Sequence, residues 1–135
     1  MSIIKQKSEF NVMAADILFK QNLYAPAIHC AYYGCFQRIK SILHNYFGIT
    51  YDDINNEVAT QRIGEHVCVL DRIIREIESR RLLPQRERKS LYNKMRDLKD
   101  LRVLADYKNE EIRYDKAETA LNFSKDIRDL LSKII

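Results

Sequence analysis

The chain has 135 residues, of which 46% are hydrophobic and 31% are charged, with a formal net charge of +4. A chain of this length is expected to form one domain spanning residues 1–135, because folding at this size already buries about two-thirds of the unfolded surface. Only three glycines and two prolines occur, which leaves few turn signals for a sheet. The composition therefore predicts an all-α fold.

The first two predicted helices follow each other closely. The first runs from about Glu9 to Gln21, with Ser8 as its N-cap. Its apolar residues recur at the spacing of one buried stripe, made of Phe10, Met13, Ala14, Ile17 and Leu18. The second starts at Tyr24 and continues for about 22 residues until Gly48 stops it. Its apolar arc is broad, so we expect other helices or a second chain to surround it.

The segment 48–62 has no helical period and is rich in Asp and Asn, whose side chains compete with helix formation. We expect a long loop there, with one short turn of helix. A third helix is predicted with the stripe Ile63, Val67, Leu70, Ile74 and Ile77. A fourth follows with the stripe Leu91, Met95, Leu98, Leu101 and Ala105. The fifth begins at a capping box formed by Asp115 and Glu118.

These five amphipathic segments with short connections predict an antiparallel, up-and-down bundle of four to five helices. No signal peptide is recognised at the start of the chain, and no apolar run approaches a membrane span, so we expect a cytoplasmic protein without a membrane partner. The three cysteines, Cys30, Cys35 and Cys68, have irregular spacing. They are expected to be reduced and packed, and no metal site or cofactor is assigned.

Positive charge is concentrated in the middle of the sequence. Between Arg72 and Arg102 there are eleven Lys or Arg residues against five Asp or Glu residues. Such a stretch is suited to binding phosphates by charge neutralisation. Acidic residues interleave with the bases, however, so a solvated face of two helices explains the pattern equally well.

Two short motifs are more informative than the composition. The second helix contains Ala27, Ala31, Tyr32, Tyr33 and Phe36 in an Ala-x3-Ala-Tyr-Tyr-x2-Phe arrangement, and the fourth ends in Arg-Val-Leu-Ala-Asp-Tyr at residues 102–107. In this order, with a histidine between them at His66, the motifs resemble those of the HEPN family of small helical bundles. The resemblance covers the chain from about Phe10 to Leu131.

The resemblance implies a dimer of four- or five-helix bundles, and it implies a metal-independent RNase in many cases. The active site of such RNases uses an arginine followed four to six residues later by a histidine, with one copy from each subunit. RNA cleavage needs a base, an acid and a fixed cation, which histidine and arginine supply. Here the corresponding positions after Arg102 hold Tyr107, Lys108 and Asn109. We therefore expect reduced or absent RNase activity.

The candidate site consists of Arg102 as a phosphate contact, with Asp106, Tyr107, Tyr33 and His66 shaping the site. These residues also have structural explanations that require no function. Arg102 and Asp106, four apart on a helix, are equally well explained as an ordinary ion pair worth about 0.2–0.5 kcal/mol. His66 is also explained as a buried, hydrogen-bonded residue. The functional interpretation requires Arg102 to be gathered into an anion-attracting pocket and not buried against its own carboxylate neighbour.

Three functions follow from these observations. The first is a HEPN-type homodimer that binds RNA or a nucleotide in a prokaryotic defence or toxin–antitoxin system. The second is a non-catalytic interaction module whose partner, by family resemblance, is a small nucleotidyltransferase. The third is a weak RNase that uses Asp106 or His66 in place of the missing histidine.

Overall fold

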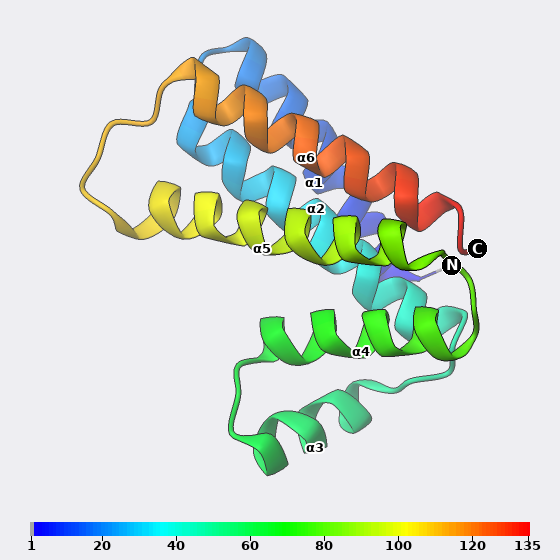
Figure 1. Ribbon diagram of the computed structural model, residues 1–135. Helices are drawn as coiled ribbons and strands as arrows, with labels where there is room; N and C mark the ends of the chain where they lie inside the picture. Colours follow the sequence, from blue (N-terminus) through cyan, green and yellow to red (C-terminus); the bar gives the residue numbers. More distant parts are fainter. Residues whose placement is uncertain (1) are drawn as a thin grey trace.

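The computed structural model describes residues 2–135, which form helices without any strand (Figure 1). The helices are α1 (Ile3–Lys20), α2 (Tyr24–Asn45), α3 (Tyr51–Gln61), α4 (Glu65–Ser79), α5 (Gln85–Tyr107) and α6 (Tyr114–Ser132). The all-α prediction is confirmed. The described chain has six helices, however, and not the five that the sequence predicted.

Helix α1 starts earlier than predicted, and the face that it buries is not the predicted one. Ser2 caps it by accepting a hydrogen bond from the backbone N–H of Lys5 at 3.3 Å, so Ser8 is not the N-cap. Ser8 is instead buried and donates its hydroxyl to the backbone carbonyl of Gly34 on α2 at 2.5 Å. Gly34 permits this close approach, since a Cβ there would lie 2.8 Å from Val12 Cγ2. Small residues therefore form the contact between α1 and α2.

The predicted buried stripe of α1 is consequently wrong. Phe10, Met13 and Ile17 are 58%, 59% and 54% exposed, and Ile3 continues the same exposed stripe. We refer to Ile3, Phe10, Met13 and Ile17 as the α1 stripe. Exposed apolar rows of this kind are uncommon on soluble proteins unless they form an interface.

Helix α2 is the central element, as predicted, and has the predicted bounds. It packs against α1, α4, α5 and α6, and most of its apolar side chains are buried. Ser124 on α6 donates a hydrogen bond to the backbone carbonyl of Ala31 at 3.3 Å, and the buried thiol of Cys35 lies 3.3 Å from its Oγ. Burial raises the pKa of Cys35 to about 11, so this thiol is a packing group.

The segment predicted as a loop contains the eleven-residue helix α3. Thr50 and Asp53 form a complete capping box, in which each side chain accepts a hydrogen bond from the other residue's backbone N–H, at 3.1 and 2.9 Å. The acidic residues Asp52 and Asp53 in the first turn also favour a helix N-terminus. The helix ends at Arg62, which adopts a left-handed conformation with φ of 57°.

The remaining helices agree with the predicted segments, with two corrections. Buried residues of α4 include Val69 and Ile73, while the predicted Val67 is 40% exposed. Helix α6 begins after Arg113 without a side-chain cap, so the predicted capping box of Asp115 and Glu118 is wrong. Glu118 accepts a hydrogen bond from the Tyr114 hydroxyl at 2.8 Å instead.

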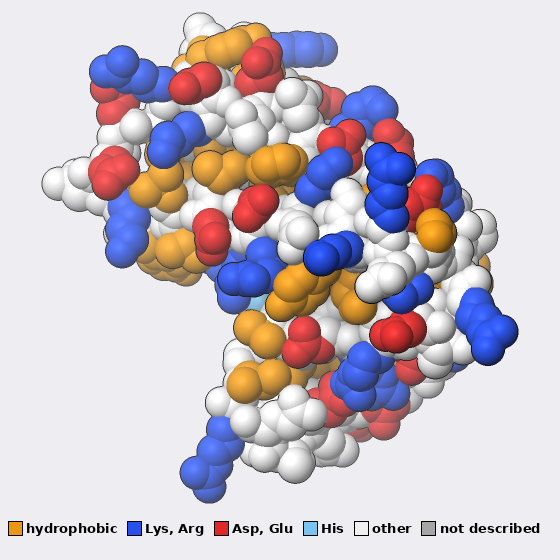
Figure 2. All heavy atoms as spheres, viewed as in Figure 1, with side chains coloured by type: hydrophobic (Ala, Val, Ile, Leu, Met, Phe, Trp, Pro, Cys, Tyr) orange, Lys and Arg blue, Asp and Glu red, His pale blue; other side chains and the backbone are white. Residues whose placement is uncertain are grey.

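Helices α3 and α4 form a hairpin that lies beside α5 on the side opposite α6 (Figure 1). Figure 2 shows that the surface is hollowed where this hairpin meets the rest of the molecule, with Lys or Arg side chains at the edge and a histidine visible inside. The carboxyl end of α5, the start of α4 and the first half of α2 come together on this side of the molecule. None of the helices within residues 2–135 combines the length and the apolar character that crossing a membrane requires.

Candidate functional site

The site is centred on Arg102, in the last two turns of α5. Its side chain is only 8% exposed, and its Nε is fully buried without a hydrogen-bond partner in residues 2–135. An unpaired buried donor costs about 1–3 kcal/mol, and more when the group is charged. This Nε–H is therefore an unsatisfied donor within the described residues, and its burial closes it to solvent.

Aromatic rings surround the guanidinium. Its central carbon lies 5.3 Å from the ring centroid of Tyr32, 5.5 Å from that of Tyr33 and 5.6 Å from that of Tyr107. The face of an aromatic ring attracts a cation. It does not neutralise the charge, and it does not replace a full hydrogen-bond acceptor for the N–H groups. Tyr107 reaches Arg102 because α5 ends at this residue. We call Arg102 and these three tyrosines the guanidinium cluster.

Asp106 is the nearest carboxylate, one helical turn after Arg102. Its Oδ2 lies 3.6 Å from Arg102 Nη1, which is an ion pair but too long for a hydrogen bond. The same oxygen lies 2.8 Å from Nδ1 of His29 on α2, and the His29 ring lies 4.7 Å from the Tyr33 ring. The predicted intrahelical ion pair therefore exists, but the carboxylate makes its closer contact with a histidine.

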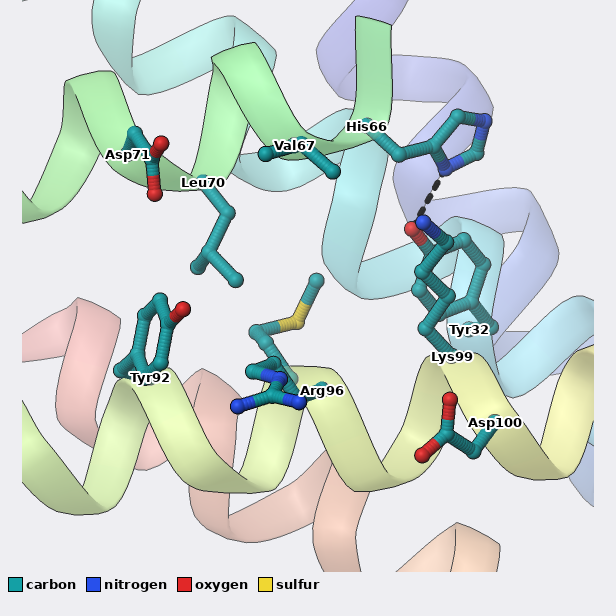
Figure 3. Close-up of a pocket in the computed structure, with 10 residues that line it drawn as sticks. Tyr32, His66, Val67, Leu70, Asp71, Tyr92, Arg96, Lys99 and Asp100 are labelled. Atoms are coloured by element: carbon teal, nitrogen blue, oxygen red, sulfur yellow. Dashed lines mark hydrogen bonds between the residues drawn. The ribbon is translucent and has the colours of Figure 1, made fainter. Parts of the chain in front are cut away.

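His66, on the first turn of α4, joins the site through Tyr32. Its Nδ1 lies 2.5 Å from the Tyr32 hydroxyl (Figure 3), and its ring stacks on Phe36 at 4.3 Å. Burial lowers the pKa of His66, and the charges of Arg102 and Lys99 lower it further. Burial also raises the pKa of Tyr32. Near neutral pH the phenol can thus donate to Nδ1, which leaves the proton of the neutral imidazole on Nε2.

The structure brings together all five residues predicted for the site. Arg102, Asp106, Tyr33 and Tyr107 lie within one cluster, and His66 adjoins it through Tyr32. Tyr32 is 1% exposed and Tyr33 is half-buried, so the two adjacent rings face different surroundings.

His29 was not among the residues that the sequence predicted for the site. His29 and Tyr33 are four residues apart on α2, so they share one face of the helix. That spacing was sufficient to place His29 at the site once Tyr33 was placed there. Lys99 was also missed, although it lies three residues before Arg102 and so shares a face of α5 with it.

One condition of the functional interpretation, that Arg102 is not buried against its own carboxylate neighbour, is not met. Arg102 is buried, and its own neighbour Asp106 is the closest acid. The unpartnered Nε and the 3.6 Å separation show that this pairing leaves the guanidinium incompletely satisfied. Chemically, the guanidinium cluster offers a fixed cation, and its neighbours His29, His66 and Asp106 add two imidazoles and a carboxylate. No group of three His, Cys, Asp or Glu side chains in residues 2–135 is arranged to hold a metal ion.

Comparison with protein-family models, with curated proteins and with solved structures finds no match to this chain. The resemblance to the HEPN family therefore stays a prediction that rests on the two sequence motifs.

Proposed function

We propose that this protein is a HEPN-type module that binds RNA or a nucleotide in a prokaryotic defence or toxin–antitoxin system. The binding site in this proposal is the guanidinium cluster, with Arg102 as the phosphate contact. Cleavage of RNA is weak or absent, because no histidine follows Arg102 on α5. The homodimer expected from the resemblance is part of the proposal.

The observation that supports this proposal most is the unsatisfied Nε of Arg102. A structural arginine that is 94% buried would be expected to donate hydrogen bonds to carboxylates or carbonyls, because its desolvation is costly. Here aromatic faces occupy that space, and the nearest carboxylate is beyond hydrogen-bond distance. A phosphate oxygen is an acceptor that a guanidinium binds in a bidentate manner.

The surroundings of the cluster favour an anion as well. Lys99 and Arg96 lie on the same helix, one and two turns before Arg102, and both border the adjacent cavity. Exposed aromatic rings near cations suit single-stranded nucleic acid, whose bases stack on them. Tyr107 is 72% exposed beside Arg102 and is positioned for such a role.

Fluorescence anisotropy with a labelled single-stranded RNA tests the proposal. Binding should weaken as salt rises from about 50 to 200 mM. Arg102→Met, which removes the charge but keeps a long side chain, should lower the affinity by about tenfold or more. The matched control is Arg86→Met, which makes the same change at an exposed position of α5.

Circular dichroism of both variants verifies that the helices are retained. If Arg102→Met and Arg86→Met bind RNA equally, or if the wild type binds no RNA at low salt, Arg102 is not a phosphate contact. RNase activity that disappears in His66→Ala would instead support the third hypothesis of a weak nuclease.

A second candidate function is supported by the α1 stripe. Four large apolar residues, between 54% and 71% exposed, follow one another along α1. They offer a face for a protein partner, which in the alternative hypothesis is a small nucleotidyltransferase. Co-purification of such an enzyme, lost in Phe10→Glu but retained in Arg102→Met, would favour this alternative over nucleic-acid binding.

A further inference from the structure

A cavity of about 250 Å³ lies between α4 and α5, beside the guanidinium cluster. Its apolar wall is formed by Val67 and Leu70 from α4 and by Met95 from α5. The Tyr92 ring stands at one end, and the hydrogen-bonded pair of His66 and Tyr32 stands at the other (Figure 3). The cavity and the cluster therefore share Tyr32, whose ring faces Arg102 and whose hydroxyl reaches the cavity.

Charge is unevenly distributed along this cavity. Its rim carries two carboxylates, Asp71 and Asp100, and two cations, Arg96 and Lys99, so the rim alone is formally neutral. Figure 3 places Asp71 at the Tyr92 end, while Lys99 extends toward His66 and Tyr32. Arg102 lies just beyond, 5.3 Å from the Tyr32 ring, and its charge is offset by the carboxylate of Asp106 at 3.6 Å. Lys99 is thus the cation on the cavity rim that favours an anionic group at the His66 end.

His66 borders this end of the cavity. Its Nδ1 is occupied by the Tyr32 hydroxyl, and Nε2, the ring nitrogen that remains for a ligand, points away from the apolar wall in Figure 3. A bound anion would favour the protonated imidazole. The ligand that fits these features has a neutral, flat part for the apolar wall and an anionic part for Lys99, His66 and Arg102.

We propose that this cavity binds the base of a nucleotide whose phosphate lies between Lys99 and Arg102. The inference rests on the proposed function and names its ligand class. A nucleobase has apolar faces, which suit Leu70 and Met95, and a polar edge, which suits the carboxylate of Asp71 and the guanidinium of Arg96. Ligand pockets for drug-sized molecules measure about 300–1,000 Å³, so this smaller cavity has room for one base and not for several.

Isothermal titration with three kinds of probe separates the two parts of the ligand. The probes are the four ribonucleoside 5′-monophosphates, the matching nucleosides and inorganic phosphate. Two cavity variants are used: Val67→Phe, which adds bulk at a position that is already 40% exposed, and Tyr92→Leu, which removes the ring. Leu23→Phe, which adds an aromatic ring at an exposed position away from the cavity, is the matched control.

The proposal expects at least one nucleotide to bind more tightly than phosphate. Val67→Phe and Tyr92→Leu should each weaken nucleotide binding by roughly 5- to 150-fold, the range for loss of base stacking. Neither variant should change the affinity for phosphate, and Leu23→Phe should change neither. Arg102→Met should weaken the binding of both nucleotide and phosphate.

Two further outcomes distinguish failure of this inference from failure of the proposed function. Nucleotide binding that depends on Arg102 but is unaffected by Val67→Phe and Tyr92→Leu would overturn the base site and leave the proposed function standing. Nucleoside binding that is lost in Val67→Phe, together with no dependence of phosphate or RNA binding on Arg102, would support a base site and overturn the proposed function. A wild-type protein that binds none of the probes would overturn the inference.

Discussion

Arg102→Met is predicted to leave the stability of the fold nearly unchanged, although it removes a buried charge. The substitution eliminates the unpartnered Nε of Arg102, a gain of about 1–3 kcal/mol. It also removes three cation–π contacts at 5.3–5.6 Å, each worth about 0.5–1 kcal/mol. These contributions offset each other, so the free energy of unfolding should change by less than about 2 kcal/mol.

Urea denaturation followed by circular dichroism measures this change directly. A structural buried ion pair behaves differently, since removing one partner of such a pair costs about 3–5 kcal/mol. A loss in that range for Arg102→Met would show that Arg102 and Asp106 form a stabilising pair, which refutes the interpretation of Arg102 as an incompletely satisfied cation. Asp106→Asn is the companion variant, because it leaves Arg102 in place and removes its nearest negative charge.

Three other predictions concern pH, packing and assembly. Burial, and then the charges of Arg102 and Lys99, lower the pKa of His66 in the folded chain. As the pH falls, His66 therefore becomes protonated in the unfolded chain at a higher pH than in the folded chain. Stability should therefore fall as the pH drops below about 6.5, and unfolding at several pH values should show a weaker pH dependence in His66→Asn. Gly34→Ala should destabilise the fold by about 1–3 kcal/mol, because the new Cβ would lie 2.8 Å from Val12. Adding Val12→Ala should restore part of the lost free energy of unfolding, measured by denaturation. No recovery in the double variant would contradict the close α1–α2 contact. Light scattering should give the wild-type protein the molar mass of a dimer, and a monomeric wild type would contradict the expected homodimer.

The sequence predicted helices well where their apolar residues pack against the rest of the same chain. Helix α2 has its predicted bounds, because Gly48 ends a long apolar pattern that is buried on several sides. The apolar pattern of α1 was equally regular, yet its large residues are exposed and its small residue Ala15 is buried. Periodicity reveals that a helix has an apolar face, but it does not reveal whether that face meets this chain or another one.

Helix α3 was missed because its Asp and Asn residues were interpreted as turn formers. Thr50 and Asp53 form a capping box, a local signal that favours a helix start and that outweighs the turn propensity of the following residues. The same signal misled the prediction at Asp115, which lies inside the first turn of α6 and is not its cap. A capping motif is therefore informative only together with the helix boundary.

The candidate site was predictable within each helix and not between helices. Arg102, Asp106 and Tyr107 belong to one motif, so their proximity follows from the end of α5. The contacts of Asp106 with His29 and of Tyr32 with His66 join residues 77 and 34 positions apart. Such contacts depend on how the helices pack, which one sequence does not specify.

The most direct test of the central claim is to follow the Nε–H resonance of Arg102 by nuclear magnetic resonance while RNA is added. Its absence from the spectrum of Arg102→Met assigns the signal. If Arg102 holds phosphate, the resonance should shift as the complex forms. A resonance that stays unchanged when the protein is saturated with RNA would show that the guanidinium does not contact the ligand.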